Sequence, residues 1–329
     1  MSIAAEGKKS KMSALLEILT SPWGKISIAA GVVALLVYFN RVDATVLSGV
    51  VRTWPWLLAA IGLMFPPFVI LSYRLKLILE SQGIQVALFQ ALRWTMVGMF
   101  FDLAMPSSCG GDLVKIGYLV KHVEAGQGTR AVMVVLFDRL LGMLGLFLLA
   151  FLAGGIGWRL LSDLPARAML VGMTFIASLG ALLFLRLAGS RRLHQSARID
   201  RLLSRFRWGE RVKELIASFN ALRERPGYLV MALGLSVLNH MFWCASLLCI
   251  VKVVGVSVDP LKGFVVFPLA LFSNLFGVAG GFGLGTAGFD LLLSQLLAIG
   301  NGALIGLVFQ SLSALVRLAG LPFYLHSSR

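Results

Sequence analysis

Long apolar segments, separated by short loops that contain Lys and Arg, recur along this chain and restrict the folds open to it. Hydrophobic residues make up 58% of the 329 residues and charged residues 14%, against about 25% charged in an average soluble domain. A helix of about 20 apolar residues crosses the hydrocarbon core and satisfies its own backbone hydrogen bonds. The sequence therefore predicts an all-α integral membrane protein.

Six segments have the apolarity expected of full spans. They lie at about 26–39, 54–73, 131–153, 166–187, 226–254 and 303–324. The first follows a basic stretch with Lys8, Lys9 and Lys11 and is not followed by a cleavage signal, so we interpret it as a span and not as a signal peptide. Residues 1–20 are then a cytoplasmic tail, and an even number of spans returns the C-terminus to the cytoplasm.

The segment 186–225 is the one sizeable polar piece between spans. It has eleven Lys or Arg and four acidic residues, a net charge of +7, which places it on the cytoplasmic side. Its apolar residues recur at helical spacing, from Ile199 to Phe206 and from Val212 to Phe219. The pattern predicts an amphipathic basic linker on the inner leaflet, with a solvated topological anchor as the alternative.

Two apolar stretches are interrupted in a way that a plain spanning helix would not tolerate. The first, 84–127, contains Pro106 and the pair Gly110-Gly111, and the second, 262–300, contains Gly280-Gly281 among other glycines. Lipid cannot satisfy the backbone groups that such breaks release, so the broken backbone requires protein or a water-filled cavity around it. We interpret each stretch as a re-entrant helical hairpin. The alternative is that the glycines only allow tight turns and close packing.

An internal repeat connects these pieces. Gly83-Ile84-Gln85-Val86 is matched by Gly255-Val256-Ser257-Val258, and Arg139-Leu140-Leu141-Gly142 by Arg317-Leu318-Ala319-Gly320. Between these landmarks lie Asp102 or Asn274 and then a glycine pair. The repeats are 21–155 and 156–329. Each would hold three spans and one hairpin, so the second starts on the opposite side of the bilayer, an inverted-repeat architecture common among secondary transporters.

Charged residues inside apolar segments indicate a polar interior. Asp138 and Arg139 lie within the span 131–153, where each charge would cost about 2.5–3.5 kcal/mol in lipid. Adjacent residues point to different sides of a helix, so each needs another partner. For Arg139 the candidates are Asp102, Asp112 and Asp290, and for Asp138 they are Lys115 and Arg317. A purely structural buried ion pair is the alternative, and Arg74, Lys76 and Arg93 are expected to be anchors at the membrane surface.

Helix starts near Asp112 and Thr286 would direct backbone N–H groups toward the membrane centre, where they suit a phosphate or carboxylate. The candidate substrate-binding or translocation residues are Asp102, Gly110, Gly111, Asp112, Lys115, Asp138, Arg139, Asn274, Gly280, Gly281, Thr286, Asp290 and Arg317.

Other classes of function lack their signatures. The net charge of +15 is distributed over membrane loops and not over a basic soluble face, which argues against nucleic acid as a partner. The three cysteines and four histidines lack metal-binding spacing, and Gly281-Phe282-Gly283-Leu284-Gly285 lacks the βαβ context of a nucleotide loop. No arrangement of nucleophile and base indicates catalysis. We expect a protein that is not an enzyme and has no cofactor or metal.

The motifs resemble a known family. Phe101-Asp102-Leu103-Ala104-Met105-Pro106 with Gly110-Gly111-Asp112, then Asp138-Arg139-Leu140-Leu141-Gly142, and the C-terminal Gly280-Gly281-Phe282-Gly283-Leu284 with Arg317, are similar to the flippase-like transmembrane region of lysylphosphatidylglycerol synthases, the multiple peptide resistance factors. The resemblance runs from about residue 20 to 325. It implies a bacterial or archaeal inner or plasma membrane and movement of an anionic, aminoacylated or polyprenyl-linked lipid between leaflets.

The chain departs from the family pattern at three positions: Asp102 replaces the usual Asn, Ala279 a Pro, and Thr286 a Glu. The 329 residues contain no synthetase module, so we expect any lipid modification to be done by another protein, such as a lipid or glycolipid synthase. The predicted function is a lipid translocase acting on lipids with anionic headgroups. The alternatives are a membrane-embedded lipid-modifying enzyme that depends on Asp112 or His122, and a non-transporting accessory subunit of a lipid or glycolipid synthase.

Overall fold

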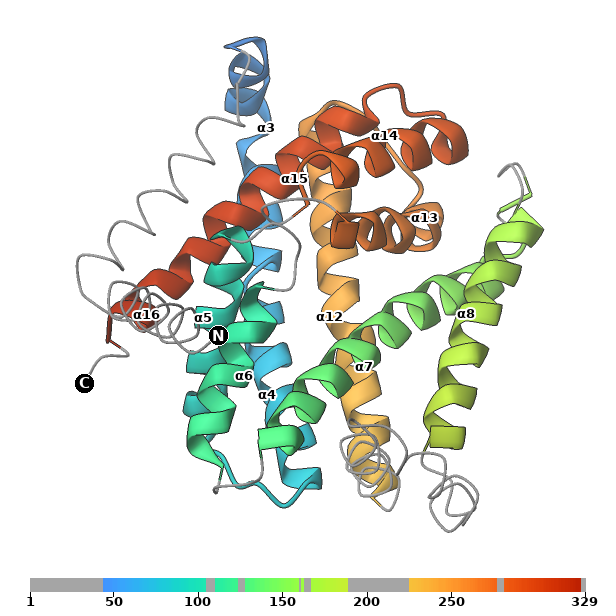
Figure 1. Ribbon diagram of the computed structural model, residues 1–329. Coiled ribbons are helices and arrows are strands. Elements are labelled where there is room, and N and C mark those ends of the chain that lie inside the picture. Colours follow the sequence, from blue (N-terminus) through green and yellow to red (C-terminus); the bar gives the residue numbers. More distant parts are fainter. Residues whose placement is uncertain are drawn as a thin grey trace, which may run out of the picture.

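A computed structural model describes residues 44–104, 110–123, 128–159, 161–162, 167–188, 225–276 and 281–326, and the regular elements within these ranges are helices (Figure 1). The cytoplasmic tail, the first expected span at 26–39, nearly all of the basic linker and Gly280 lie outside the described residues. The prediction of an all-α protein is confirmed for the part of the chain that the structure covers.

Four helices are long and apolar enough to cross a membrane, judged by length and composition. They are Thr53–Ser81, α7 (Gly128–Ile156), α12 (Pro226–Val253) and Gly302–Leu325. The first combines the second half of α3 (Ala44–Leu63) with α4 (Pro66–Ser81). The last combines α15 (Gly302–Arg317), η2 (Leu318–Gly320) and α16 (Leu321–Leu325). These helices coincide with the second, third, fifth and sixth expected spans. The fourth is α8 (Arg167–Ala188), whose apolar part is shorter. The total of six spans stays a prediction.

Each interrupted stretch forms two short helices packed against each other. The first pair is α5 (Leu88–Ala104) and α6 (Gly110–His122); the second is α13 (Pro260–Ser273) and α14 (Leu284–Leu297), joined through the short η1 (Asn274–Phe276). With 13 to 17 residues, these helices are about 20–26 Å long and cannot cross about 30 Å of hydrocarbon alone. In Figure 1 the two pairs lie in opposite parts of the molecule, α5–α6 at lower left and α13–α14 at upper right.

The turns that lead into the two pairs have the same backbone geometry. Gly83 after α4 has a φ angle of 80° and Gly255 after α12 has a φ angle of 82°, values that favour glycine. In both turns the next residue donates its N–H to the carbonyl five residues back, Ile84 to Leu79 and Val256 to Val251, each at 3.0 Å. The matched motifs that begin at Gly83 and Gly255 therefore form the same type of helix-ending turn.

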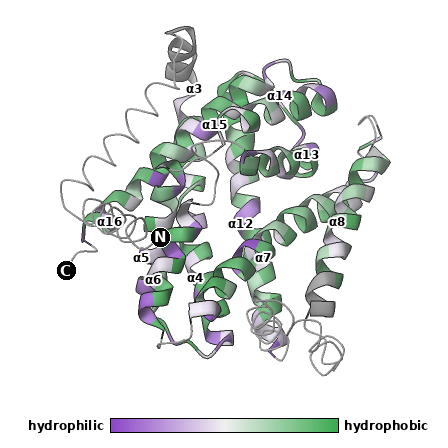
Figure 2. Ribbon diagram, in the orientation of Figure 1, coloured by the Kyte–Doolittle hydropathy of each residue, from purple (hydrophilic) through white to green (hydrophobic). Residues whose placement is uncertain are grey.

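Helix α12 lies at the centre and contacts α3, α4, α7 and α13. Its buried Trp243, Leu247 and Ile250 belong to one apolar cluster with Phe267 of α13 and Phe289 of α14. Figure 2 shows hydrophilic residues in the middle of α7 and α12, where the two otherwise apolar helices cross. The core of the bundle is therefore apolar on the α13–α14 side and polar at this crossing.

Close approach of α5 and α6 depends on two glycines. A Cβ atom at Gly111 would lie 2.7 Å from the carbonyl carbon of Gly98 and 2.8 Å from Asp102 Oδ1. Both contacts are far inside ordinary van der Waals distance, and the first is with backbone that cannot rotate away. Gly111 thus has the packing role that was one of the two expected roles of the glycine pair.

We expect Gly111→Ala to lower the stability of the protein by about 1–3 kcal/mol, because the added methyl group overpacks the α5–α6 contact. Thermal unfolding in detergent, followed by circular dichroism, measures the change. Gly117→Ala in the same helix is the matched control, since a Cβ there meets no atom within 4 Å and alanine is the better helix former. Equal melting temperatures for the two variants would contradict the packing role.

Candidate functional site

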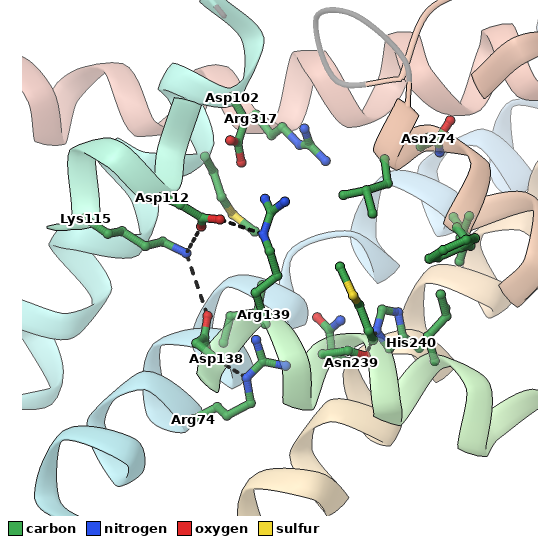
Figure 3. Close-up of a pocket in the computed structure, with 18 residues that line it drawn as sticks. Arg74, Asp102, Asp112, Lys115, Asp138, Arg139, Asn239, His240, Asn274 and Arg317 are labelled. Carbon is green, nitrogen blue, oxygen red and sulfur yellow. Dashed lines mark hydrogen bonds and ion pairs between the residues drawn. The ribbon is translucent and has the colours of Figure 1, made fainter. Parts of the chain in front are cut away.

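A cavity of about 270 Å³ opens where α4, α5, α6, α7, α12 and α15 meet the end of α13 (Figure 3). Its charged and amide-bearing lining residues are Arg74, Asp102, Asp112, Lys115, Asp138, Arg139, Asn239, His240, Asn274 and Arg317. Met99, Met143 and Leu146 are among the apolar residues that complete the wall. The volume is close to the lower end of the roughly 300–1,000 Å³ range of small-molecule sites, a size suited to a headgroup and not to acyl chains.

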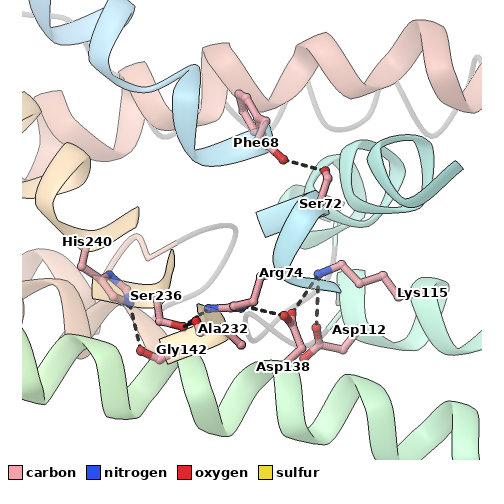
Figure 4. A network of polar contacts seen from close by, with 10 residues as sticks. All are labelled: Phe68, Ser72, Arg74, Asp112, Lys115, Asp138, Gly142, Ala232, Ser236 and His240. Atoms are coloured by element: carbon pink, nitrogen blue, oxygen red, sulfur yellow. Dashed lines mark hydrogen bonds and ion pairs between the residues drawn. The ribbon is translucent and has the colours of Figure 1, made fainter. Parts of the chain in front are cut away.

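A chain of ion pairs connects α4, α6 and α7 on one side of this cavity (Figures 3 and 4). Arg74 Nε donates to Asp138 Oδ1 at 2.7 Å, and Lys115 Nζ lies 3.9 Å from Asp138 Oδ2 and 4.0 Å from Asp112 Oδ1. The side chains of Arg74 and Asp138 are only 4% and 8% exposed. Arg74 Nη1 also donates to Ser236 Oγ of α12 at 2.8 Å, so the network reaches a fourth helix.

Arg74 is a correction to the sequence analysis, which assigned it to the membrane surface. Its position on α4 turns the side chain into the bundle, where it is the nearest partner of Asp138. The expected partner Lys115 is present at the longer distance, and Arg317 makes no ion pair with Asp138 among the described residues. The contact between Arg74 and Asp138 could not be predicted from the sequence, because the rotation of α4 about its axis depends on packing between helices.

Arg139 Nε lies 2.6 Å from Asp112 Oδ2, so one of its three expected partners is the observed one. Asp112 is in the first turn of α6, as expected from a helix start after the glycine pair. Asp290, another of the three candidates, lies on α14. Its carboxylate accepts the backbone N–H of Ala303 at 2.9 Å, at the start of α15, and it does not line the cavity.

Arg317, from the end of α15, reaches the same cavity as Arg139 and lies near Asp102 (Figure 3). Asp102 Oδ1 accepts the N–H of Gly111 at 2.7 Å and so fixes the break between α5 and α6. The Nε atom of Arg317 is buried and has no hydrogen-bond partner among the described residues. A buried donor without a partner is costly, so the Nε–H group of Arg317 is the candidate donor to a ligand at the cavity.

Asn239 and His240 of α12 form the opposite wall and were not singled out from the sequence. Asn239 is 3% exposed with its Oδ1 unpartnered, and His240 places Nε2 3.0 Å from the carbonyl oxygen of Gly142 (Figure 4). An adjacent amide and imidazole in the middle of an apolar span are themselves a signal, because polar groups at that depth usually face the bundle interior.

The second break repeats the arrangement of the first with neutral groups. Gln310 Nε2 of α15 donates to Asn274 Oδ1 at 2.9 Å and to the carbonyl oxygen of Gly281 at 3.0 Å, and Thr286 Oγ1 donates to Gln310 Oε1 at 2.7 Å. A Cβ at Gly281 would collide with Asn274, as one at Gly111 would collide with Asp102. Gln310 was not predicted from the sequence, and it joins both sides of this break.

Seven of the candidate residues line the cavity: Asp102, Asp112, Lys115, Asp138, Arg139, Asn274 and Arg317. Gly110, Gly111, Gly281 and Thr286 shape the helix breaks behind it, Asp290 lies elsewhere, and Gly280 is outside the described residues. The described residues contain no group of three His, Cys, Asp or Glu side chains that could hold a metal ion.

Long apolar helices around a buried charged cavity define a multi-pass helical membrane protein with an internal polar site. The chain belongs to the lysylphosphatidylglycerol synthase transmembrane-region family, whose model matches residues 23–320. This match confirms the resemblance seen in the motifs. Comparisons with curated proteins and with solved structures gave no significant match.

Proposed function

We propose that this protein is a lipid translocase that moves a lipid with an anionic headgroup between membrane leaflets through the cavity. The observation that carries the proposal is that Arg139 of α7 and Arg317 of α15, from opposite halves of the chain, line one headgroup-sized space. Charged groups at membrane depth usually mark a substrate or ion pathway. Membership of a family named for lipid synthases supports a role connected with membrane lipids.

The charge of the cavity lining favours a monoanion. Arg74, Lys115, Arg139 and Arg317 contribute four positive charges against three carboxylates, those of Asp102, Asp112 and Asp138, which leaves a net charge of +1. A phosphodiester carries one negative charge and accepts hydrogen bonds from guanidinium groups in a bidentate manner. Binding of such a headgroup would neutralise the lining, whereas an uncharged headgroup would leave its net charge at +1.

We also propose the inverted repeat, with units 21–155 and 156–329 and re-entrant hairpins 84–127 and 262–300. The shared glycine turns and the matched contacts Asp102 to Gly111 and Asn274 to Gly281 support it. Transporters of this build bind substrate near the bilayer midplane between broken helices and expose it alternately to each side. In that arrangement both termini lie in the cytoplasm of a bacterial or archaeal cell, and the basic linker 186–225 lies on the inner leaflet.

Proteoliposomes test the translocase directly. We expect liposomes with the purified protein to transfer a fluorescent anionic phospholipid between leaflets at least about tenfold faster than protein-free liposomes, and faster than a zwitterionic analogue with the same chains. Dithionite quenching of the outer leaflet measures the rate. An unchanged anionic rate with correctly folded protein would contradict the proposal.

The same preparation separates the two rival functions. A lipid-modifying enzyme would leave a covalent change in the extracted lipid, detectable by mass spectrometry, and would lose it in Asp112→Asn or His122→Gln. An accessory subunit would move no lipid alone and would co-purify with a lipid or glycolipid synthase. We propose that the protein itself is not an enzyme, so we expect extracted lipids of unchanged mass.

A further inference from the structure

Three side chains that line the cavity each carry a buried polar atom without a hydrogen-bond partner among the described residues. Across the described residues such atoms occur on five side chains, and three of these, Asn239, His240 and Arg317, line the cavity. Unpartnered buried polar atoms are rare in folded proteins, because each forfeits its bonds to water. Their concentration in the lining of one cavity points to water in the empty site, and to the polar groups of a ligand in the occupied site, as the missing partners.

The three atoms differ in their hydrogen-bonding role, as donor or acceptor, between the two walls of the cavity. The Nε atom of Arg317 is a donor. On α12, His240 Nε2 lies 3.0 Å from the carbonyl oxygen of Gly142 of α7, which can only accept, so Nε2 carries the hydrogen. In the neutral ring Nδ1 is then an acceptor, like Oδ1 of Asn239 beside it. The ligand must therefore offer an acceptor to Arg317 and hydrogen-bond donors to α12.

We propose that Asn239 and His240 form a subsite that recognises hydroxyl groups of the headgroup, next to the arginines that hold its anionic group. This inference rests on the proposed function and adds the source of its selectivity. The residues single out headgroups in which hydroxyls lie near a phosphodiester, as in polyol or glycosyl phospholipids. A phospholipid with an aliphatic headgroup leaves both acceptors buried and unpaired.

Hydroxyl groups fit this wall better than an ammonium group does. Arg74 donates to Ser236 Oγ at 2.8 Å, and Ser236 is one helical turn before His240 on α12. The guanidinium of Arg74 is therefore close to the subsite, and its charge also acts on His240. A second cation on the ligand would be repelled there, whereas a neutral hydroxyl donates a hydrogen bond without that cost.

Lipids of equal charge test the subsite. Native mass spectrometry of the detergent-purified protein would compare phosphatidylglycerol, phosphatidylethanol and phosphatidylserine with identical acyl chains, all of net charge −1. We expect phosphatidylglycerol to bind about tenfold more tightly than phosphatidylethanol, which lacks the hydroxyls, because two hydrogen bonds are lost. We expect phosphatidylserine, whose extra donor is an ammonium group, to bind like phosphatidylethanol.

Asn239→Leu and His240→Phe should bring the ratio of the phosphatidylglycerol and phosphatidylethanol affinities close to one. Leucine is close to asparagine in size and removes an unpaired buried oxygen, so we expect Asn239→Leu to fold at least as stably as the wild type. Thr95→Val is the matched control. It removes another buried unpartnered oxygen, on a side chain 1% exposed and outside the cavity lining, and should keep the selectivity.

The outcomes distinguish this inference from the proposed function. Equal binding of the three lipids by the wild type, or a preference for phosphatidylserine, would overturn the hydroxyl subsite and leave the translocase proposal standing. Selectivity that survives in both Asn239→Leu and His240→Phe would overturn the assignment to α12. Selective binding without any lipid movement in proteoliposomes would overturn the translocase and leave the subsite in place.

Discussion

Asp138→Leu is expected to destabilise the protein by about 3–5 kcal/mol, the range found when one partner of a buried ion pair is removed. The substitution leaves Arg74, with a side chain 4% exposed, without the carboxylate that its Nε contacts at 2.7 Å. It also removes one of the two carboxylates near Lys115. Thermal unfolding in detergent would measure the loss as a lower melting temperature.

A double variant separates buried charge from lost packing. Arg74→Met combined with Asp138→Leu removes both members of the pair, and Lys115 keeps Asp112 at 4.0 Å, so we expect at least half of the lost stability to return. Lys76→Met is the control for loss of a cation. Its pair with Glu80 at 3.0 Å is partly exposed, with Lys76 26% accessible, and should contribute less than about 1 kcal/mol. A double variant as unstable as the sum of its singles would contradict this account.

Arg317→Met is expected to slow the transfer of a labelled anionic phospholipid in proteoliposomes by about tenfold or more. A hydrogen bond to a charged group contributes about 1.5–3 kcal/mol, equivalent to about 10- to 100-fold in affinity. The Nε atom of Arg317 has no hydrogen-bond partner among the described residues, but the substitution also takes a positive charge away from Asp102. The melting temperature is therefore measured in parallel, to separate a loss of transfer from a loss of stability. Transfer at the wild-type rate would remove Arg317 from the proposed mechanism.

Two further arginines serve as comparisons for Arg317. Arg139→Ala should also slow transfer, but it leaves Asp112 without its 2.6 Å partner and should lower stability as well. Arg93→Met removes a guanidinium that donates to the carbonyl oxygen of His326 at 3.1 Å and does not line the cavity, so it should leave transfer unchanged. Equal transfer rates in Arg93→Met and Arg317→Met would indicate a general effect of positive charge and not a specific site.

The sequence by itself determined the class, the family and most of the helices of this protein. Apolar length is a local property, so the spans at α7, α12 and α15 could be found from composition. The two breaks were also predictable, because proline and paired glycines disfavour a continuous helix. The matched motifs at Gly83 and Gly255 adopt nearly the same φ angle, so this similarity in sequence predicted a similarity in local structure.

Only the tertiary structure decided which polar groups share the cavity. Arg74 lies 64 residues from Asp138, and Gln310 lies 36 residues from Asn274, so their contacts depend on how whole helices rotate and cross. The same holds for Asn239 and His240, which face the arginines because α12 packs at the centre of the bundle. Side-chain partners across a helical bundle follow from packing between elements, and the spacing within one segment does not encode that packing.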